Sequence, residues 1–407
     1  MAFWDLFLVA LVPVLETLLI TLLGLFIATE RFNLLRDIDA RNYLNNIVYY
    51  IFTPALIAAQ LAETITYDRL VEMWFMFVNI FLTFVVGSVL GWMLNKIART
   101  PQHLRGLVNG CCTAGNLGNL VLIIVPAVCD ESDSPFGDSS TCETYGDAYA
   151  SVSAGVSSLF IWTYLYIIMG ANMERNTEIM NTCSDYSTIT ESLIIPSTNI
   201  VSSDNISIQY DESICNNRIG NKMSFLDYIT WPITKCNKYI KLEMVFTPST
   251  IAVIIGFIIG AVSPIQKLMV GDDAPLRAII KSIALVGEGT IVSMTLIVGA
   301  NLLDGLKQSG ISWYLIIGIM VVRFILSPLL GVLIVKAAYY WGLVGSYNLY
   351  QFVLMLQYAL PPATSVGTIA QLLGVAESEC SLIMLWTYAV STFTLTLWCT
   401  FFMWMLD

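Results

Sequence analysis

The chain has 407 residues, of which 57% are hydrophobic and 12% are charged, and its mean hydropathy is +0.72. Soluble domains are about 45–50% apolar and about 25% charged, so this composition excludes a soluble enzyme and a disordered protein and leaves a polytopic membrane protein. The formal net charge is -11, from 19 Lys and Arg against 30 Asp and Glu. Nucleic-acid binding as a main activity is excluded too, because a phosphate backbone demands a basic face.

Apolar segments long enough to cross a bilayer, which takes about 20 residues, occur ten times and predict an all-α protein. Five lie on each side of a hydrophilic segment, so we expect a first five-helix repeat over 1–170, a hydrophilic loop over 171–246 and a second five-helix repeat over 247–407. Because five is odd, the second half enters the membrane from the opposite side, and any repeat is an inverted one. The predicted spans are 7–28, 44–62, 73–95, 106–128, 147–170, 247–265, 282–303, 311–335, 350–374 and 381–405.

Lys and Arg are unevenly distributed between the two sets of loops that connect these spans. Thirteen lie in the set that includes the 171–246 loop, five lie in the opposite set, and Arg323 lies inside a span. Loops rich in Lys and Arg stay on the cytosolic side of a membrane. We therefore expect a cytosolic 171–246 loop, with both termini facing the lumen or the exterior.

The fourth predicted span has two glycines and two asparagines at its centre, namely Gly115, Asn116, Gly118 and Asn119. These residues disfavour an uninterrupted helix, and irregular backbone at membrane depth is tolerated where it is buried in protein or lines a cavity. The two asparagines would share one face if the segment were helical, and each amide offers an acceptor and donors. We predict a break and a polar binding site here, with glycine-mediated helix packing as the alternative.

Cysteine and histidine usage predicts no metal site and no cofactor. His103 is the only histidine and lies beside a loop, so nothing supports hydrolysis or metal chemistry. Cys129 and Cys142 bracket twelve residues of a loop that we expect to be lumenal. In that compartment a disulfide and two free thiols are both open possibilities.

Three formally charged side chains fall well inside the predicted spans, namely Glu16, Glu288 and Arg323. A charge at membrane depth is a functional candidate: the acids could relay protons or accept a hydrogen bond from a substrate, and Arg323 could pair with either acid or with a substrate carboxylate. A structural ion pair, or a position nearer the interface, is the alternative. Thr53-Pro54 in the second span is a weaker cavity candidate, because a mid-span proline can be only a kink.

The ninth predicted span carries a double proline, Pro361-Pro362, at its centre. Each proline lacks an N–H group and clashes with the carbonyl four residues before it, so we predict a second break. A half-helix that begins at Pro361 or Pro362 would point the N–H groups of Ala363, Thr364 and Ser365, and two hydroxyls, into a cavity. Such a helix start attracts anions. The fourth span of each half is then the broken one, as expected for a 5+5 inverted repeat with crossing helices four and nine and an NhaA-like architecture.

Recognisable motifs occur along nearly the whole chain, in the segments Ala114–Leu120, Val125–Glu131, Ser134–Gly137, Ile161–Tyr164 and Ala359–Tyr388. Together these motifs resemble the PIN-LIKES branch of the plant auxin efflux carriers. The resemblance implies ten spans in an inverted repeat, residence in the endoplasmic reticulum membrane, and a role in the intracellular accumulation and homeostasis of auxin, indole-3-acetic acid. The chain departs from the family pattern at Val121, where members usually have proline, and at Ser365, where they usually have asparagine.

These observations lead to the hypothesis of a secondary carrier for an aromatic carboxylate, with a small-molecule substrate and the lipid bilayer as its partners. A membrane auxin sensor or scaffold without net transport, and a sodium-coupled organic-anion symporter, are the alternatives. The direction of transport, the coupling ion and the oligomeric state, for which a homodimer is one option, stay open. The residues expected to contact the substrate are Gly115, Asn116, Gly118, Asn119, Pro361, Pro362, Thr364 and Ser365.

Overall fold

The computed structural model describes residues 15, 18–32, 34–66, 71–130, 136–170, 247–271, 273–308 and 311–406. Within these ranges every named element is helical, which confirms the prediction of an all-helical polytopic membrane protein. Glu16 and the hydrophilic loop over 171–246 lie outside the described residues.

Six helices in the described ranges are long and apolar enough to cross a membrane. Three of them contain a five-residue π-helical turn, labelled η. The six are α2 (Ile38–Ile47) with η1 (Val48–Phe52) and α3 (Thr53–Thr64), α5 (Trp74–Ile97), α8 (Ser139–Phe160) with η2 (Ile161–Leu165), α15 (Arg277–Gln308), α16 (Trp313–Val321) with η3 (Val322–Leu326) and α17 (Ser327–Tyr340), and α20 (Glu377–Leu406).

Two of the π-turns have a local cause in the sequence. The turns η1 and η3 end two residues before Pro54 and Pro328, respectively. Proline has no N–H to donate to the carbonyl four residues before it, which opens the regular helical ladder. For Pro328 that carbonyl is Phe324, and its oxygen accepts a hydrogen bond from Trp398 Nε1 of α20 at 2.8 Å instead. The neighbouring helix thus satisfies the backbone that proline leaves open.

Within the described residues, the remaining predicted spans are represented by shorter or interrupted helices. The sixth is divided into α13 (Pro248–Ala261) and α14 (Ser263–Met269), which meet at 98°, and counting the pair as one span gives up to seven candidate spans. Leu18–Ile27 and Leu120–Cys129 are shorter apolar helices. The fourth and ninth spans are each interrupted, between α6 (Gln102–Thr113) and α7 (Asn119–Asp130), and between α18 (Asn348–Ala359) and α19 (Ser365–Leu372).

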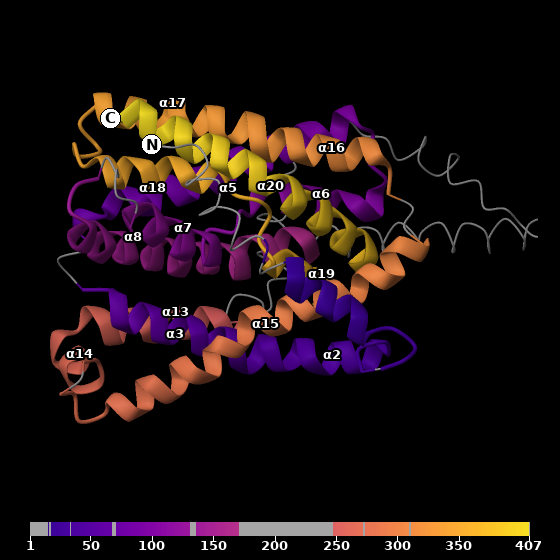
Figure 1. Ribbon diagram of the computed structural model, residues 1–407, viewed down its shortest axis with the longest axis horizontal. Helices are drawn as coiled ribbons and strands as arrows, with labels where there is room; N and C mark the ends of the chain where they lie inside the picture. Colours follow the sequence, from indigo (N-terminus) through magenta and orange to yellow (C-terminus); the bar gives the residue numbers. More distant parts are fainter. Residues whose placement is uncertain are drawn as a thin grey trace, which may run out of the picture.

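The helices form two groups (Figure 1). One contains α2, α3, α13, α14 and α15, and the other contains α5 to α8, α16 to α18 and α20. Helix α15 of the first group also contacts α20 of the second. Helix α19 contacts both α2 of the first group and α20 of the second. The interrupted helices therefore place their breaks where the two groups meet.

Candidate functional site

The two interruptions, residues 114–118 and 360–364, pair with each other through their backbones. The Asn116 N–H donates to the Pro361 carbonyl at 2.9 Å, and the Ala363 N–H donates to the Ala114 carbonyl at 2.9 Å. Between these bonds, Gly115 and Pro362 form an isolated antiparallel β-bridge. The pairing satisfies backbone groups that a helix break at membrane depth would otherwise leave without partners.

The half-helix that follows the double proline begins later than the sequence predicted. We expected it to start at Pro361 or Pro362, but α19 begins at Ser365. A residue that precedes proline is driven to extended backbone, as Leu360 is, with a ψ of 148°, and the same restriction applies to Pro361. The Ala363 N–H, an expected substrate donor, is used in the backbone pairing. Thr364 and Ser365 are left at the start of α19.

The asparagines of the fourth span also lie differently from the prediction. Asn116 is in the interruption and Asn119 is the first residue of α7, so the two do not share a helical face. The Asn116 Nδ2 donates to the Tyr388 hydroxyl at 2.7 Å, and that hydroxyl donates to the Pro362 carbonyl at 3.1 Å. Tyr388 of α20 thereby connects both interruptions. The side chain of Asn119 lies outside the described part of the structure.

Arg323 is buried, with 2% of its surface exposed, and its partners are main-chain carbonyls. Its Nη1 donates to Cys112 O at 3.2 Å, and its Nη2 donates to Leu360 O and, at 3.4 Å, to Pro361 O. Of the partners that the sequence left open for Arg323, Glu288 is exposed on α15 and Glu16 lies outside the described residues. Arg323 instead contacts both interrupted helices.

A cavity, here called the crossover cavity, lies beside the paired interruptions. Five of the predicted site residues line it, and the prolines at 361 and 362 do not. The lining residues in the described part of the chain carry hydroxyl, amide and apolar groups, and none of them is formally charged. The predicted residues in the lining are Gly115, Asn116, Gly118, Thr364 and Ser365.

Several lining residues were missed by the sequence reasoning. Gln60 of α3, Ser157 and Ser158 of α8 and Thr290 of α15 add polar groups, and their signal was a polar residue inside an apolar span. Thr53, which the sequence did offer as a weaker cavity candidate, also lines the cavity. It is 5% exposed, and its hydroxyl is a buried group without a hydrogen-bond partner. The apolar part of the wall includes Leu56, Ile57, Trp162, Ile291 and Met294.

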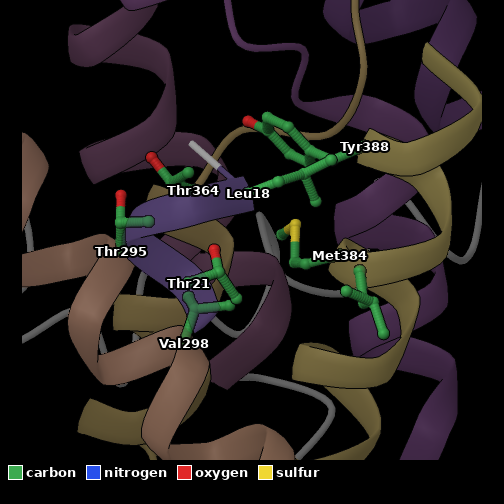
Figure 2. Close-up of a pocket in the computed structure, with 8 residues that line it drawn as sticks. Leu18, Thr21, Thr295, Val298, Thr364, Met384 and Tyr388 are labelled. Carbon is green, nitrogen blue, oxygen red and sulfur yellow. The ribbon is translucent and has the colours of Figure 1, made fainter. Parts of the chain in front are cut away.

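A second, smaller pocket lies between α15, α20 and the helix Leu18–Ile27. Figure 2 shows Thr295 and Val298 projecting into it from α15, and Met384 and Tyr388 from α20. Thr364 lines both this pocket and the crossover cavity. The start of α19 therefore lies between the two hollows.

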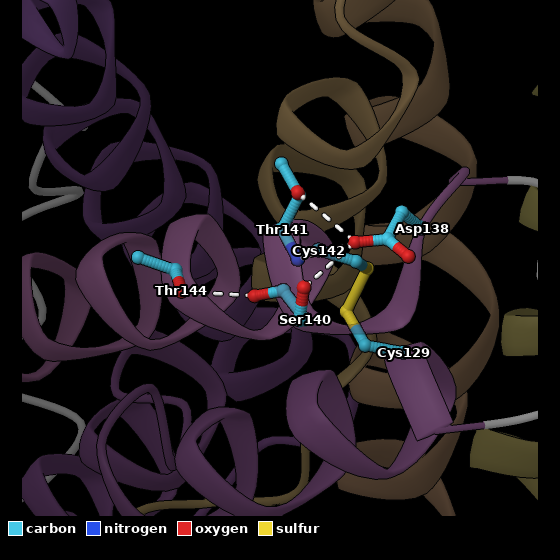
Figure 3. The surroundings of a disulfide bond; sticks show 6 residues. All are labelled: Cys129, Asp138, Ser140, Thr141, Cys142 and Thr144. Carbon is cyan, nitrogen blue, oxygen red and sulfur yellow. Dashed lines mark hydrogen bonds between the residues drawn. A yellow bond between two sulfur atoms is a disulfide. The ribbon is translucent and has the colours of Figure 1, made fainter.

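The cysteines of the α7–α8 loop form a disulfide, Cys129–Cys142, which resolves the alternative that the sequence left open. The bond joins the end of α7 to the first turn of α8 (Figure 3). Asp138 caps α8 by accepting a hydrogen bond from the Thr141 N–H at 3.4 Å. It also accepts hydrogen bonds from the hydroxyls of Ser140 and Thr141, and together these bonds lower the pKa of Asp138. Residues between the cysteines thus support the start of α8.

Comparison with known proteins places the chain in a family. A family of membrane transport proteins matches residues 9–399. PIN-LIKES 3 of Arabidopsis thaliana is 46% identical over 402 residues, covering 98% of each chain, and PIN-LIKES 1 of the same plant is 46% identical over 403 residues, covering 98% of this chain and 80% of the relative. An uncharacterized transporter of Schizosaccharomyces pombe is 22% identical over 414 residues, covering 93% and 91% of the two chains.

These matches bear on the class of protein. They are to multi-pass membrane transporters and not to enzymes, which implies a small-molecule substrate. The long apolar helices and the interrupted spans agree with that class. The chain belongs to the PIN-LIKES family of membrane transport proteins.

Proposed function

We propose that the protein is a secondary carrier for auxin, indole-3-acetic acid, across the endoplasmic reticulum membrane, and that it controls the intracellular accumulation of this hormone. The observation that carries the proposal is the crossover cavity. One side of this cavity holds the start of the half-helix α19 together with amide and hydroxyl groups, and the other side is an apolar wall. None of the described lining residues is formally charged. An aromatic carboxylate has the same division into an anionic end and an apolar body.

The carboxylate would be bound at the start of α19. A helix start carries partial positive charge and orients N–H groups toward an anion. The hydroxyls of Thr364 and Ser365 and the amide of Asn116 line the cavity at this point, and Asn119 begins α7 next to it. Hydrogen bonds to an ionised acceptor are stronger than those between neutral groups, so a neutral lining suffices to bind the anion.

The indole ring would pack against the apolar part of the wall. Trp162 and Ile161 of the η2 turn and Met294 of α15 line this side. Aromatic rings stack or meet edge to face at favourable energies, and the methionine thioether packs well against a ring. The Gln60 amide or the unpartnered Thr53 hydroxyl would accept the indole N–H.

Alternating access would follow from the position of Thr364 between the two hollows. The Thr364 hydroxyl contacts the Met294 sulfur at 4.0 Å, so movement of α19 against α15 would connect or separate the crossover cavity and the second pocket. The proposed architecture is ten spans in a 5+5 inverted repeat, with the group of α2, α3, α13 and α15 as the scaffold.

The proposed orientation places the 171–246 loop in the cytosol and both termini in the lumen. The distribution of Lys and Arg supports it. The disulfide Cys129–Cys142 supports it independently, because its loop is on the predicted lumenal side and thiols in the cytosol stay reduced. The endoplasmic reticulum as the location rests on the family resemblance.

Uptake of labelled indole-3-acetic acid into proteoliposomes tests the proposal. We expect Asn116→Ala and Asn119→Ala to lower uptake about tenfold or more, because a lost hydrogen bond to a charged group is worth about 1.5–3 kcal/mol. Asn348→Ala is the control, since Asn348 lies at the outer start of α18, where it donates to the Leu406 carbonyl. Undiminished uptake in both site variants would overturn the site assignment. Saturable binding without time-dependent accumulation would replace the carrier by a sensor.

A further inference from the structure

The local sequence around Arg323 places this residue in a π-helical turn. It is the second residue of η3, the π-turn that ends before Pro328. A π-turn adds a residue to the helical ladder and re-aims the side chains within it. Trp398 stabilises this turn by donating a hydrogen bond to the Phe324 carbonyl. The turn directs the guanidinium toward the paired interruptions, 114–118 and 360–364, here called the crossover.

The guanidinium meets the ends of two helices at once. Cys112 lies in the last turn of α6, and Leu360 is the C-cap residue that directly follows α18. The last carbonyls of a helix lack helical partners and carry partial negative charge. Arg323 donates to both of these carbonyls and to Pro361 O. One fixed cation thus neutralises the negative ends of both half-helices inside the membrane.

Carriers with interrupted helices commonly use such carbonyl ends to coordinate a coupling cation. We propose that Arg323 is a positioning residue whose guanidinium takes the place of that cation, so that the crossover is assembled, and transport proceeds, without bound sodium. Arginine keeps its charge in proteins and its planar fork can bridge two acceptors. The carbonyls are then committed to a side chain that cannot dissociate.

The guanidinium packs closely against Gly115. A Cβ atom at that position would collide with Nη2 of Arg323, so a larger residue there would displace the guanidinium from its carbonyl partners. Gly115 also lines the crossover cavity. The positive charge therefore lies directly behind the cavity wall, where it also favours an anionic substrate over a neutral or cationic one.

The transport arm of the test rests on the proposed function and uses proteoliposomes with labelled indole-3-acetic acid. We expect the wild-type initial rate to be unchanged when sodium chloride is replaced by choline chloride. Arg323→Ala should be about tenfold slower or worse, because two buried helix ends lose their counter-charge, and guanidinium chloride should restore several-fold of that loss relative to choline chloride. Arg323→Lys, which keeps the charge without the fork, should fall between the two.

A second arm does not depend on the substrate. The unfolding temperature of purified Arg323→Ala should rise with guanidinium chloride relative to choline chloride, since the free cation binds the vacated site. The wild type should show no such rise. Lys336→Ala is the matched control, because Lys336 lies in α17 more than three turns beyond Arg323, and neither its rate nor its unfolding temperature should respond to guanidinium.

Three results would overturn the inference. They are a wild-type rate that depends on sodium, an Arg323→Ala rate equal to that of the wild type in choline, and an Arg323→Ala protein whose unfolding temperature ignores guanidinium. Should Arg323→Ala fail to fold, the sodium dependence of the wild type and the intermediate rate of Arg323→Lys decide the matter. If the wild type moves no indole-3-acetic acid, the proposed function fails while the unfolding arm still tests Arg323.

Discussion

The two interruptions of the crossover are equal in length but differ in how the chain makes them. Residues 114–118 break the fourth span with glycine and asparagine, whereas residues 360–364 break the ninth with two prolines. The prolines lack N–H groups and present carbonyls, which accept from Asn116, Tyr388 and Arg323. The first interruption supplies a side-chain amide to the cavity and the second supplies acceptors that hold the crossover together. Two unlike sequences therefore form one paired structure.

The half-helices that follow the interruptions, α7 and α19, are also attached to their neighbouring helices by different kinds of bond. The start of α7 is held by Ser153 Oγ, which donates to Leu117 O at 3.1 Å, and its end is joined covalently to α8. Helix α19 is held to α2 by side-chain bonds, from Asn45 Nδ2 to Thr368 O at 3.4 Å and from Gln371 Nε2 to Asn42 Oδ1 at 3.3 Å. A disulfide remains intact during a transport cycle, whereas such hydrogen bonds can break and form again. The comparison indicates that α7 moves with α8, while α19 can separate from α2.

The largest expected effect on stability comes from removing the disulfide that joins α7 to α8. Cys129→Ser with Cys142→Ser opens a loop with a sequence separation of 13, and loop-closure entropy for a loop of that size gives a loss of about 3 kcal/mol in the free energy of unfolding. Thermal or denaturant unfolding in detergent measures it. Reduction of the wild type with dithiothreitol is the matched control: it should lower wild-type stability to that of the double variant and leave the double variant unchanged. Equal stability of wild type and variant would remove the distinction between α7 and α19.

A smaller effect is expected where the two interruptions touch. In Gly115→Ala the new Cβ collides with Arg323, which is held by three carbonyls and cannot shift freely. Overpacking of this kind costs about 1–3 kcal/mol, and we expect a lower unfolding temperature and about tenfold slower uptake of indole-3-acetic acid. At Gly118 the nearest atom to an added Cβ is the Ala154 Cβ at 3.6 Å, an ordinary contact. The unfolding temperature of Gly118→Ala should therefore stay near that of the wild type, and equal losses in both variants would contradict the assigned role of Gly115.

The sequence was informative about where the helices break and less so about what the breaks do. Glycine, asparagine and proline act locally on the backbone, so the interruptions beside Gly115 and Pro361 could be predicted from single residues. Their partners could not, because the pairing of Asn116 with Pro361 joins segments far apart in the chain. For the same reason the sequence suggested only charged partners for Arg323, an intramembrane acid or a substrate carboxylate. Its partners in the structure are main-chain oxygens, which occur at every residue and leave no mark in the sequence.

The cavity shows the same limit. Thr364 and Ser365 were predicted because they follow the double proline, whereas Gln60 and Thr290 come from helices with no break nearby and were missed. The sequence also predicted the presence of membrane-spanning segments more reliably than it predicted how many of them are single helices. Hydropathy marks apolar stretches, but it does not show that the sixth stretch bends by 98° between α13 and α14.

The smallest expected effect tests whether the second interruption can supply an amide as the first does. Ser365, the first residue of α19, lines the cavity. In Ser365→Asn the added amide donors lie at the helix start where the carboxylate is proposed to bind, and a net gain of about 0.5–1 kcal/mol per hydrogen bond predicts an affinity for indole-3-acetic acid about two- to fivefold higher. Ser158→Asn adds the same group to the α8 wall of the same cavity and should not raise the affinity. If both variants gain equally, amide content rather than the start of α19 sets the affinity.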